Sequence, residues 1–176
     1  RLAYDELLSN QLTIGLVRLQ LKKNKGRVLA GDDTLSQKAL EALPFTLTGA
    51  QKTAVDEIRN DMRLPERMLR LLQGDVGSGK TAVAFMAMVH AIGSEKEKAQ
   101  AVIMAPTEIL ARQHEINITK YAARCGLHVV TLTGRDKGKH REKLLAMIAS
   151  GAAHIVIGTH ALFQEDVAFK DLALVI

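Results

Sequence analysis

The sequence predicts an α/β fold in which a parallel sheet carries helices on both faces. Short apolar runs alternate with longer segments in which apolar residues recur at helical spacing. The short runs are apolar throughout, which is typical of parallel strands that are covered on both faces. A glycine-rich loop at residues 74–81 separates one such run from an apolar helix, and strand–loop–helix units of this kind build parallel sheets.

The first part of the chain has helical periodicity. Leucines at helical spacing predict a helix over residues 1–23. The basic turn at 22–27 is interpreted either as a solvated helix end or as a contact for phosphate. A short helix then ends at Ala42, before a proline. We therefore expect residues 1–43 to form a helical linker and residues 44–176 to form an α/β lobe that is incomplete at its C-terminal end.

Caps and breakers delimit the elements of the lobe. Thr48 and Thr107 are good N-caps for two helices, and the turn at 63–66 separates the first of these from the next strand. The expected strands are residues 68–72, 101–105, 128–132, 154–157 and 172–176, and the expected helices are residues 49–62, 82–89, 107–123 and 137–149.

Composition limits the class of partner. The chain has 176 residues, of which 47% are apolar and 24% are charged, and these values fit a globular domain. A net charge of +5 favours polyanions as partners. With 3% aromatic residues and no Trp, contacts to phosphates are a better expectation for nucleic-acid binding than stacking on bases. The single Cys125 excludes an internal disulfide and is expected to be a small buried or half-buried side chain. The longest uncharged stretch, residues 81–94, is too short to cross a bilayer, so no membrane partner is expected.

The loop at residues 74–81 fits the phosphate-binding pattern G-x-x-x-x-G-K-[ST]. Glycines let successive backbone N–H groups point inward at a phosphate, Lys80 reaches the β- and γ-phosphates, and Thr81 offers its hydroxyl to Mg²⁺. The alternative is a glycine-rich turn that holds no ligand. The residues expected to bind nucleoside triphosphate here are Gly74, Asp75, Val76, Gly77, Ser78, Gly79, Lys80 and Thr81.

Four stretches of the chain resemble the first motor lobe of superfamily 2 helicases, specifically of the RecG type. They are residues 44–51, 74–81, 105–114 and 157–162. The resemblance implies a RecA-like lobe of an enzyme that uses ATP and Mg²⁺ to translocate on duplex DNA and to remodel branched DNA in repair and recombination. It also implies a location in the bacterial cytoplasm at the nucleoid, with a second motor lobe and a wedge domain as partners. The transcription–repair coupling factor has a similar motor, although residues 132–139 look more like the RecG type.

The resemblance assigns roles to particular residues. Gln51 is expected to read adenine, because its amide both accepts from N6–H and donates to N7. Phe45 is a candidate for the same adenine site, and packing against the sheet is the alternative that we favour. Thr107 either only initiates its helix or also binds a DNA phosphate. The residues expected to follow the DNA backbone, from the carboxyl ends of the strands, are Pro106, Thr107, Arg112, Thr133, Gly134, Arg135, Thr159 and His160.

A dense basic cluster lies beside the expected DNA edge. It consists of Arg135, Lys137, Lys139, His140, Arg141 and Lys143. Such a run is commonly a solvated helix face, and attraction of phosphate is the interpretation that we favour at this edge.

Hydrolysis of ATP requires an acidic residue at the end of a later strand to hold Mg²⁺. The resemblance implies an Asp-Glu-x-His box after the strand at 172–176, past the last residue of the sequence. We therefore expect the parent protein to be an ATP-dependent DNA helicase with Lys80 as a catalytic residue. The isolated 176-residue chain is expected to bind nucleotide at most weakly and not to hydrolyse it. The alternatives are a P-loop ATPase unrelated to DNA, such as a kinase, and a non-enzymatic interaction domain.

Overall fold

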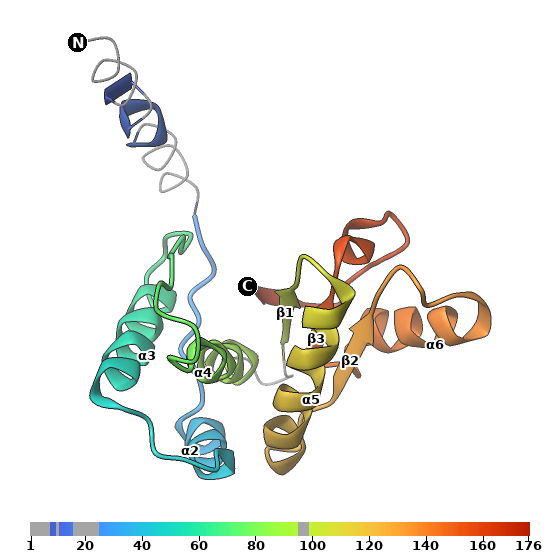
Figure 1. Ribbon diagram of the computed structural model, residues 1–176, viewed down its shortest axis with the longest axis horizontal. Helices are drawn as coiled ribbons and strands as arrows, with labels where there is room; N and C mark the ends of the chain where they lie inside the picture. The colour runs from blue at the N-terminus through green and yellow to red at the C-terminus, as the bar shows by residue number, and fades with distance from the viewer. Residues whose placement is uncertain (1–7, 10, 16–24, 95–98) are drawn as a thin grey trace.

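A four-stranded parallel sheet with the strand order β2-β3-β1-β4 lies at the centre of the fold (Figure 1). The computed structural model describes residues 8–9, 11–15, 25–94 and 99–176. The strands are β1 (Gln100–Met104), β2 (Val129–Leu132), β3 (Ile155–Gly158) and β4 (Leu172–Val175). The helices are α2 (Asp33–Ala42), α3 (Gly49–Met62), α4 (Lys80–Ile92), α5 (Glu108–Arg124) and α6 (Gly138–Ala149), with a 3₁₀ turn η1 (His160–Phe163).

Helices cover both faces of the sheet, as the sequence predicts. Ile103 and Ile155 belong to one core, which α4 and α5 complete. Val102 and Val156, the neighbours of these residues along β1 and β3, belong to a second core with α6 and η1. Because successive side chains of a strand point to opposite faces, a strand between two dry cores is apolar at every position. All of β3 is buried, which accounts for its unbroken apolar run.

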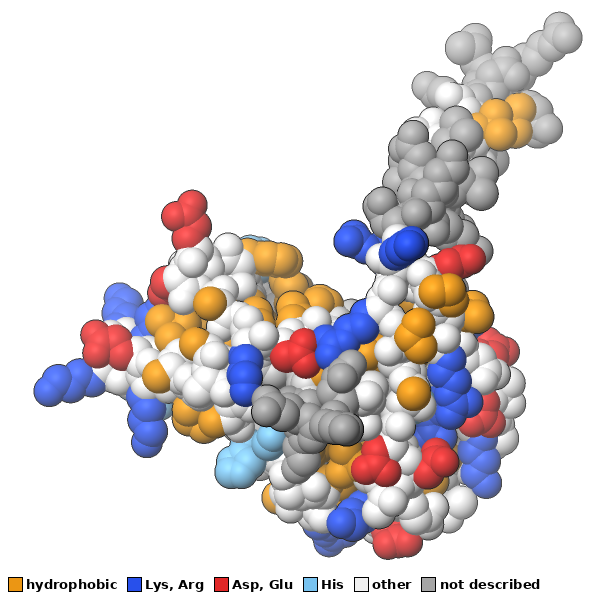
Figure 2. All heavy atoms as spheres, turned by 180° about the vertical axis from the view of Figure 1, so that it is seen from behind, with side chains coloured by type: hydrophobic (Ala, Val, Ile, Leu, Met, Phe, Trp, Pro, Cys, Tyr) orange, Lys and Arg blue, Asp and Glu red, His pale blue; other side chains and the backbone are white. Residues whose placement is uncertain are grey.

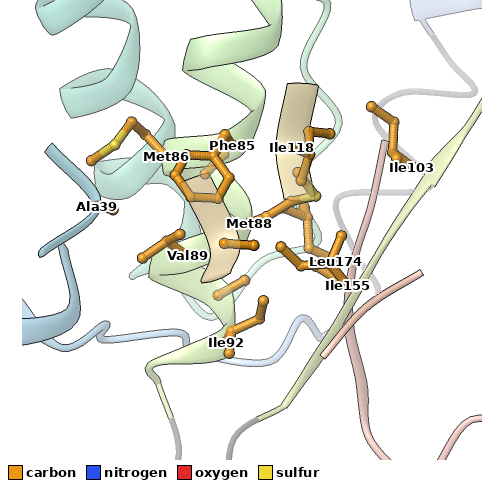
Figure 3. Close-up of a cluster of buried hydrophobic side chains, with 14 of the residues drawn as sticks. Ala39, Phe85, Met86, Met88, Val89, Ile92, Ile103, Ile118, Ile155 and Leu174 are labelled. Atoms are coloured by element: carbon orange, nitrogen blue, oxygen red, sulfur yellow. The ribbon is translucent and has the colours of Figure 1, made fainter. Parts of the chain in front are cut away.

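The apolar helix α4 is the central element of the larger core. Of its 13 residues, 10 are buried, so it is covered on nearly every side, as a helix that is apolar all round requires. Figure 3 shows Met88 of α4 beside Ile155 and Leu174 of the sheet, with Ile118 of α5 close by. The N-terminal end of α4 is therefore held on a rigid body.

A buried amide ties together the opposite, amino-terminal edge of the sheet. Gln100, at the start of β1, is 0% exposed. Its Nε2 donates to the carbonyls of Ile148 and Ala153 at 2.9 and 2.8 Å, and its Oε1 accepts from the backbone N–H of Asp171 at 3.1 Å. The single side chain thereby joins the end of α6 to the entries of β3 and β4. Both the Nε2 and the Oε1 of the amide are hydrogen-bonded, as a buried polar group requires.

The strand expected at residues 68–72 is absent from the described structure, so this prediction is wrong. Within the described residues β4 is one edge strand of the sheet, and the β-pairing of the segment after α3 is limited to an isolated bridge between Lys25 and Glu66. Leu69 and Leu71 are 73% and 83% exposed. A strand exists only where a partner accepts its backbone hydrogen bonds, and apolar residues alone do not supply that partner.

Residues 25–31 run as a connector between the segment after α3 and the start of β4. Gly26 N–H donates to the Pro65 carbonyl, and the guanidinium of Arg27 makes a two-point ion pair with the Asp171 carboxylate. Arg27 is therefore a structural residue in the part of the basic turn that is described. Residues 22–24 of that turn lie outside the described residues.

The predicted helix at residues 1–23 is described only in part. Residues 8–9 and 11–15 are helical, and the remainder of that prediction lies outside the described residues. Leu8 and Leu12 are exposed. In the described part of the chain, no helix is both long enough and apolar enough to span a membrane.

The connector is fastened to the C-terminal end of α4 through a buried histidine. His90 is 2% exposed, and its Nε2 lies 3.1 Å from the Leu29 carbonyl oxygen, to which it donates. Gly31 has a φ of 78° and lies against the imidazole, where a Cβ atom would come within 2.2 Å of the ring. Ser94 Oγ accepts from the Gly31 N–H at 2.9 Å. Burial lowers the pKa of His90 because a charged imidazole would lose its hydration.

The lowered pKa of His90 predicts a loss of stability in mild acid. The unfolded chain takes up a proton near the ordinary pKa of about 6.5, whereas the folded chain resists protonation. The free energy of unfolding is therefore expected to fall as the pH decreases below about 6.5, and the titration of His90 should add no pH dependence at higher pH. Urea unfolding of the wild type and of His90→Gln at pH 7.5 and 5.5 measures the effect. The variant, whose amide has an N–H that can donate to the Leu29 carbonyl but does not titrate, should lose less stability on acidification.

Burial also lowers the pKa of His114, which contributes a loss in the same direction. The His90→Gln variant is therefore expected to keep a smaller pH dependence, and adding His114→Gln should reduce it further. Equal losses for the wild type and His90→Gln would rule out the role of His90.

Candidate nucleotide and DNA site

The glycine-rich loop ends at the open N-terminus of α4. Gly77 and Gly79 have φ values of 84° and 81°, in the left-handed region that favours glycine. Gly79 is the N-cap of α4, and no side chain caps this helix. The backbone N–H groups of the first turn, together with the positive end of the helix dipole, therefore face a loop that is exposed to solvent. This is a site for an anion.

Lys80 closes the loop on itself. Its Nζ donates to the carbonyl oxygens of Gly74 and Asp75, both at 2.7 Å. The ammonium group is thus already inside the loop that its sequence pattern assigns to phosphate. Thr81 follows it in the first turn of α4 and is partly buried.

Gln51 connects the start of α3 to this loop. Its Oε1 accepts from the Thr48 N–H at 2.9 Å and its backbone N–H donates to the Thr48 hydroxyl at 3.3 Å, which forms a capping box. Its Nε2 donates to the Ser78 carbonyl at 2.9 Å. A Cβ on Gly79 would lie 2.3 Å from that Nε2, so the second glycine is needed for close approach as well as for its φ value.

Phe45 does not pack against the sheet. It is 45% exposed and lies in a surface hollow with Leu40 of α2 and Lys52 of α3. The favoured expectation for its packing is therefore wrong. The chain turns sharply between α2 and α3 at this point, and the turn carries the ring to the outside.

The carboxyl ends of β1, β2 and β3 meet around a second hollow. It is lined by Pro106, Glu108, Gly134, Thr159, His160 and Gln164, among others. The ends of β2 and β3 approach closely here, and a Cβ on Gly158 would lie only 2.3 Å from the Leu132 carbonyl oxygen. Thr107, beside the hollow, caps α5 by accepting from the Leu110 N–H at 3.3 Å. Four of the residues expected to follow DNA thus lie together, although they are as many as 54 positions apart in the sequence (106 to 160).

Residues 48–176 match the family described as DEAD/DEAH box helicase. The chain belongs to the DEAD/DEAH box helicase family. The expected α/β fold, a RecA-like lobe with a parallel sheet covered on both faces, is accordingly confirmed.

Individual DEAD/DEAH box helicases align with the whole chain. It is 47% identical over 176 residues to the ATP-dependent DNA helicase RecG of Escherichia coli strain K12, of which it covers 25%. The protein of the same name from Thermotoga maritima is 43% identical and is covered to 22%. A solved structure described as RecG bound to a three-way DNA junction has a TM-score of 0.88 and 43% identity, over 99% of this chain and 24% of that chain. The RecG-type resemblance is confirmed, and the chain spans about a quarter of the length of these relatives.

One residue assigned to the DNA edge of the helicase lobe is not accessible. Thr133 is 0% exposed, and its hydroxyl donates to Asp136 Oδ2 at 3.0 Å. The same carboxylate oxygen accepts from the Thr133 backbone N–H at 2.7 Å. The expectation that Thr133 offers its hydroxyl to DNA is therefore wrong in this structure, because the residue instead fixes the turn after β2.

The basic cluster of the helicase lobe divides into paired and exposed residues. Arg141 makes a two-point ion pair with Asp166 at 3.0 to 3.1 Å and also donates to Gln164 at 2.6 Å. It therefore holds the loop after η1 and is not available to phosphate. Figure 2 shows Lys and Arg side chains projecting from the end of the molecule that α6 forms, and the exposed lysines of the cluster are Lys137, Lys139 and Lys143.

Ion pairs also involve the arginines assigned to DNA. Arg112 pairs with Glu115 at 3.0 Å, and this bond raises the pKa of Arg112. Arg135 pairs with Glu108 at 3.0 Å. The sequence places Glu108 in the first turn of its helix, but it does not predict the pairing of Glu108, Glu115 or Asp136 with neighbouring side chains. The T-x-x-D spacing from Thr133 to Asp136 was the available local signal for a side chain bonded to its own turn.

Proposed function

We propose that the chain is the ATP-binding lobe of a DNA helicase or translocase that remodels branched DNA in repair and recombination. The observation that carries the proposal is the hollow at the carboxyl ends of β1, β2 and β3, where Pro106, Gly134, Thr159 and His160 gather. A parallel sheet presents its ligand sites at this edge. The three-way DNA junction bound by the structurally similar RecG supports branched DNA as the partner.

The nucleotide is proposed to be ATP with Mg²⁺, and the loop fits the phosphates. Backbone N–H groups of residues 74–79 and of the first turn of α4 cradle them, and Lys80 neutralises their charge. Thr81 is the residue of this chain that would hold Mg²⁺, which neutralises charge that develops on the phosphates. For Gln51 to read adenine, its Nε2 must leave the Ser78 carbonyl, so nucleotide binding and release of the loop are expected to occur together.

DNA is proposed to lie across the hollow with its backbone toward Thr107, Thr159 and His160. Backbone N–H groups, hydroxyls and an imidazole are groups that position a phosphate without reading sequence. Such an enzyme needs a second motor lobe and a DNA-binding wedge domain, and it works in the bacterial cytoplasm at the nucleoid. The bacterial relatives, of which this chain covers about a quarter, support further domains and a bacterial enzyme.

The proposal is tested by DNA binding. The double variant Thr159→Val/His160→Ala is expected to weaken binding of a fluorescently labelled three-way junction by about ten-fold, because it removes two phosphate contacts. Binding is measured at fixed salt with the protein at its natural length. Thr119→Val, which changes an exposed threonine of α5, serves as the matched control and should change affinity less than about two-fold. Unchanged affinity in the double variant would rule out the strand-end hollow as the DNA site, and a wild-type protein that does not bind the junction would favour an ATPase unrelated to DNA.

A further inference from the structure

An acidic side chain lies on the surface that is proposed to bind a polyanion. Glu108, in the first turn of α5, lines the hollow formed with Pro106, Gly134 and Thr159. It also lines a neighbouring apolar hollow that contains Ile109 and Arg135. Its carboxylate therefore stands between the two hollows. A carboxylate here opposes DNA by charge repulsion, unless it has a compensating role.

The carboxylate of Glu108 holds the guanidinium of Arg135. Glu108 Oε2 lies 3.0 Å from Arg135 Nε, and the side chains are 26% and 84% exposed respectively. The pair joins α5 to the turn after β2, two elements that the chain reaches 27 positions apart (108 to 135). A guanidinium carries further N–H donors on its two terminal nitrogens, which bind phosphate in a two-point manner.

The backbone of Arg135 is already fixed by its neighbours. Its N–H donates to the Thr133 hydroxyl oxygen at 3.4 Å, and Asp136 accepts from both the N–H and the hydroxyl of Thr133. The long side chain is the remaining source of freedom, and an exposed arginine side chain samples many rotamers. The contact with Glu108 restricts that freedom before DNA arrives, which reduces the entropy lost on binding.

We propose that Glu108 is a positioning residue that orients Arg135 so that its terminal nitrogens bind a DNA phosphate beside the strand-end hollow. The inference rests on the proposed function, because it presumes that DNA lies at this edge. Glu108 would therefore favour DNA binding although its own charge repels DNA. Removing the acid should weaken DNA binding, whereas simple charge repulsion predicts that the same change strengthens it.

The test compares the removal of Glu108 with the removal of a second glutamate, Glu142. Glu108→Ala is expected to weaken binding of a labelled three-way junction by about five-fold, because Arg135 loses its orientation. Glu142→Ala, which removes the same charge from an exposed position on α6, should leave affinity unchanged or strengthen it up to about two-fold. Glu108→Gln keeps an oxygen that accepts from Arg135, so its affinity should lie between those of the wild type and Glu108→Ala. Urea unfolding confirms that each variant is folded.

The pairing itself is tested with Arg135→Ala. This variant should weaken binding by about ten-fold, and Glu108→Ala/Arg135→Ala should be no weaker than Arg135→Ala alone. Both single variants should also reduce the salt dependence of binding by about one phosphate contact, an effect that a merely structural role of Glu108 would not produce.

The outcomes separate this inference from the proposed function. Tighter binding by Glu108→Ala, or a further loss when it is added to Arg135→Ala, overturns the positioning role while Thr159→Val/His160→Ala still weakens binding. A wild-type protein that does not bind the junction overturns both proposals.

Discussion

Replacing Lys80 with alanine is expected to lower ATP hydrolysis by at least about 100-fold, the usual effect of removing one preorganised charge from a reacting oxyanion. Lys80 Nζ already lies within 2.7 Å of the Gly74 and Asp75 carbonyls, inside the loop where the phosphates are proposed to bind. Neutralising this position leaves the phosphates facing two carbonyl oxygens with no cation between them. The measurement is steady-state ATP hydrolysis by the protein at its natural length, with and without junction DNA.

The matched control for this prediction is Lys120→Ala, which removes an exposed lysine from α5. Its rate of ATP hydrolysis should stay within about two-fold of the wild-type rate. The free energy of unfolding of both variants should lie within about 1 kcal/mol of the wild-type value, since neither position is in the core. Substantial hydrolysis by folded Lys80→Ala would contradict the assignment of this lysine to the phosphates.

Gln100→Leu is expected to lower the free energy of unfolding by about 3 kcal/mol, although leucine has a similar volume. The change leaves the Asp171 N–H and the Ala153 carbonyl without the partner that the amide supplies at present. A buried polar group without a partner destabilises a fold more than an added apolar contact stabilises it. Urea unfolding followed by circular dichroism gives the value directly.

The control for this variant is Gln37→Leu, at an exposed glutamine of α2 that donates to Glu41. It should change stability by less than about 0.5 kcal/mol. Because Gln100 lies at the amino-terminal edge of the sheet, away from the phosphate loop, Gln100→Leu should bind nucleotide with unchanged affinity when it is folded. A loss of nucleotide affinity under conditions where the variant is folded would show that the two edges are coupled.

Local signals predicted much of the fold. Helix α3 spans Gly49–Met62 as expected, because Thr48 and Gln51 form a complete capping box that is visible in the sequence. The Thr107 cap likewise defines the start of α5. The missing strand at 68–72 shows the limit of such signals. Its apolar residues predict burial, but strand formation depends on a distant partner for its backbone, which periodicity does not reveal.

The candidate site follows the same division. The glycine-rich pattern predicted the loop at the start of α4, and strand ends predicted a gathering of Pro106, Thr159 and His160. The exclusion of Thr133 depends on Asp136, and that of Arg141 depends on Asp166, which is 25 positions away. Charge pairing at a surface is set by the tertiary fold, so a basic run in a sequence overstates the cations that are available to DNA.

The connector is fastened to α4 at His90, near the end of the helix that lies opposite the phosphate loop. The helix has 13 residues and is therefore about 20 Å long, with Lys80 and Thr81 at one end and His90 at the other. Leu29 and Gly31 of the connector contact the C-terminal end of α4, and Arg27 joins the connector to the entry of β4. The connector and the phosphate loop are thus attached to opposite ends of one stiff, buried helix.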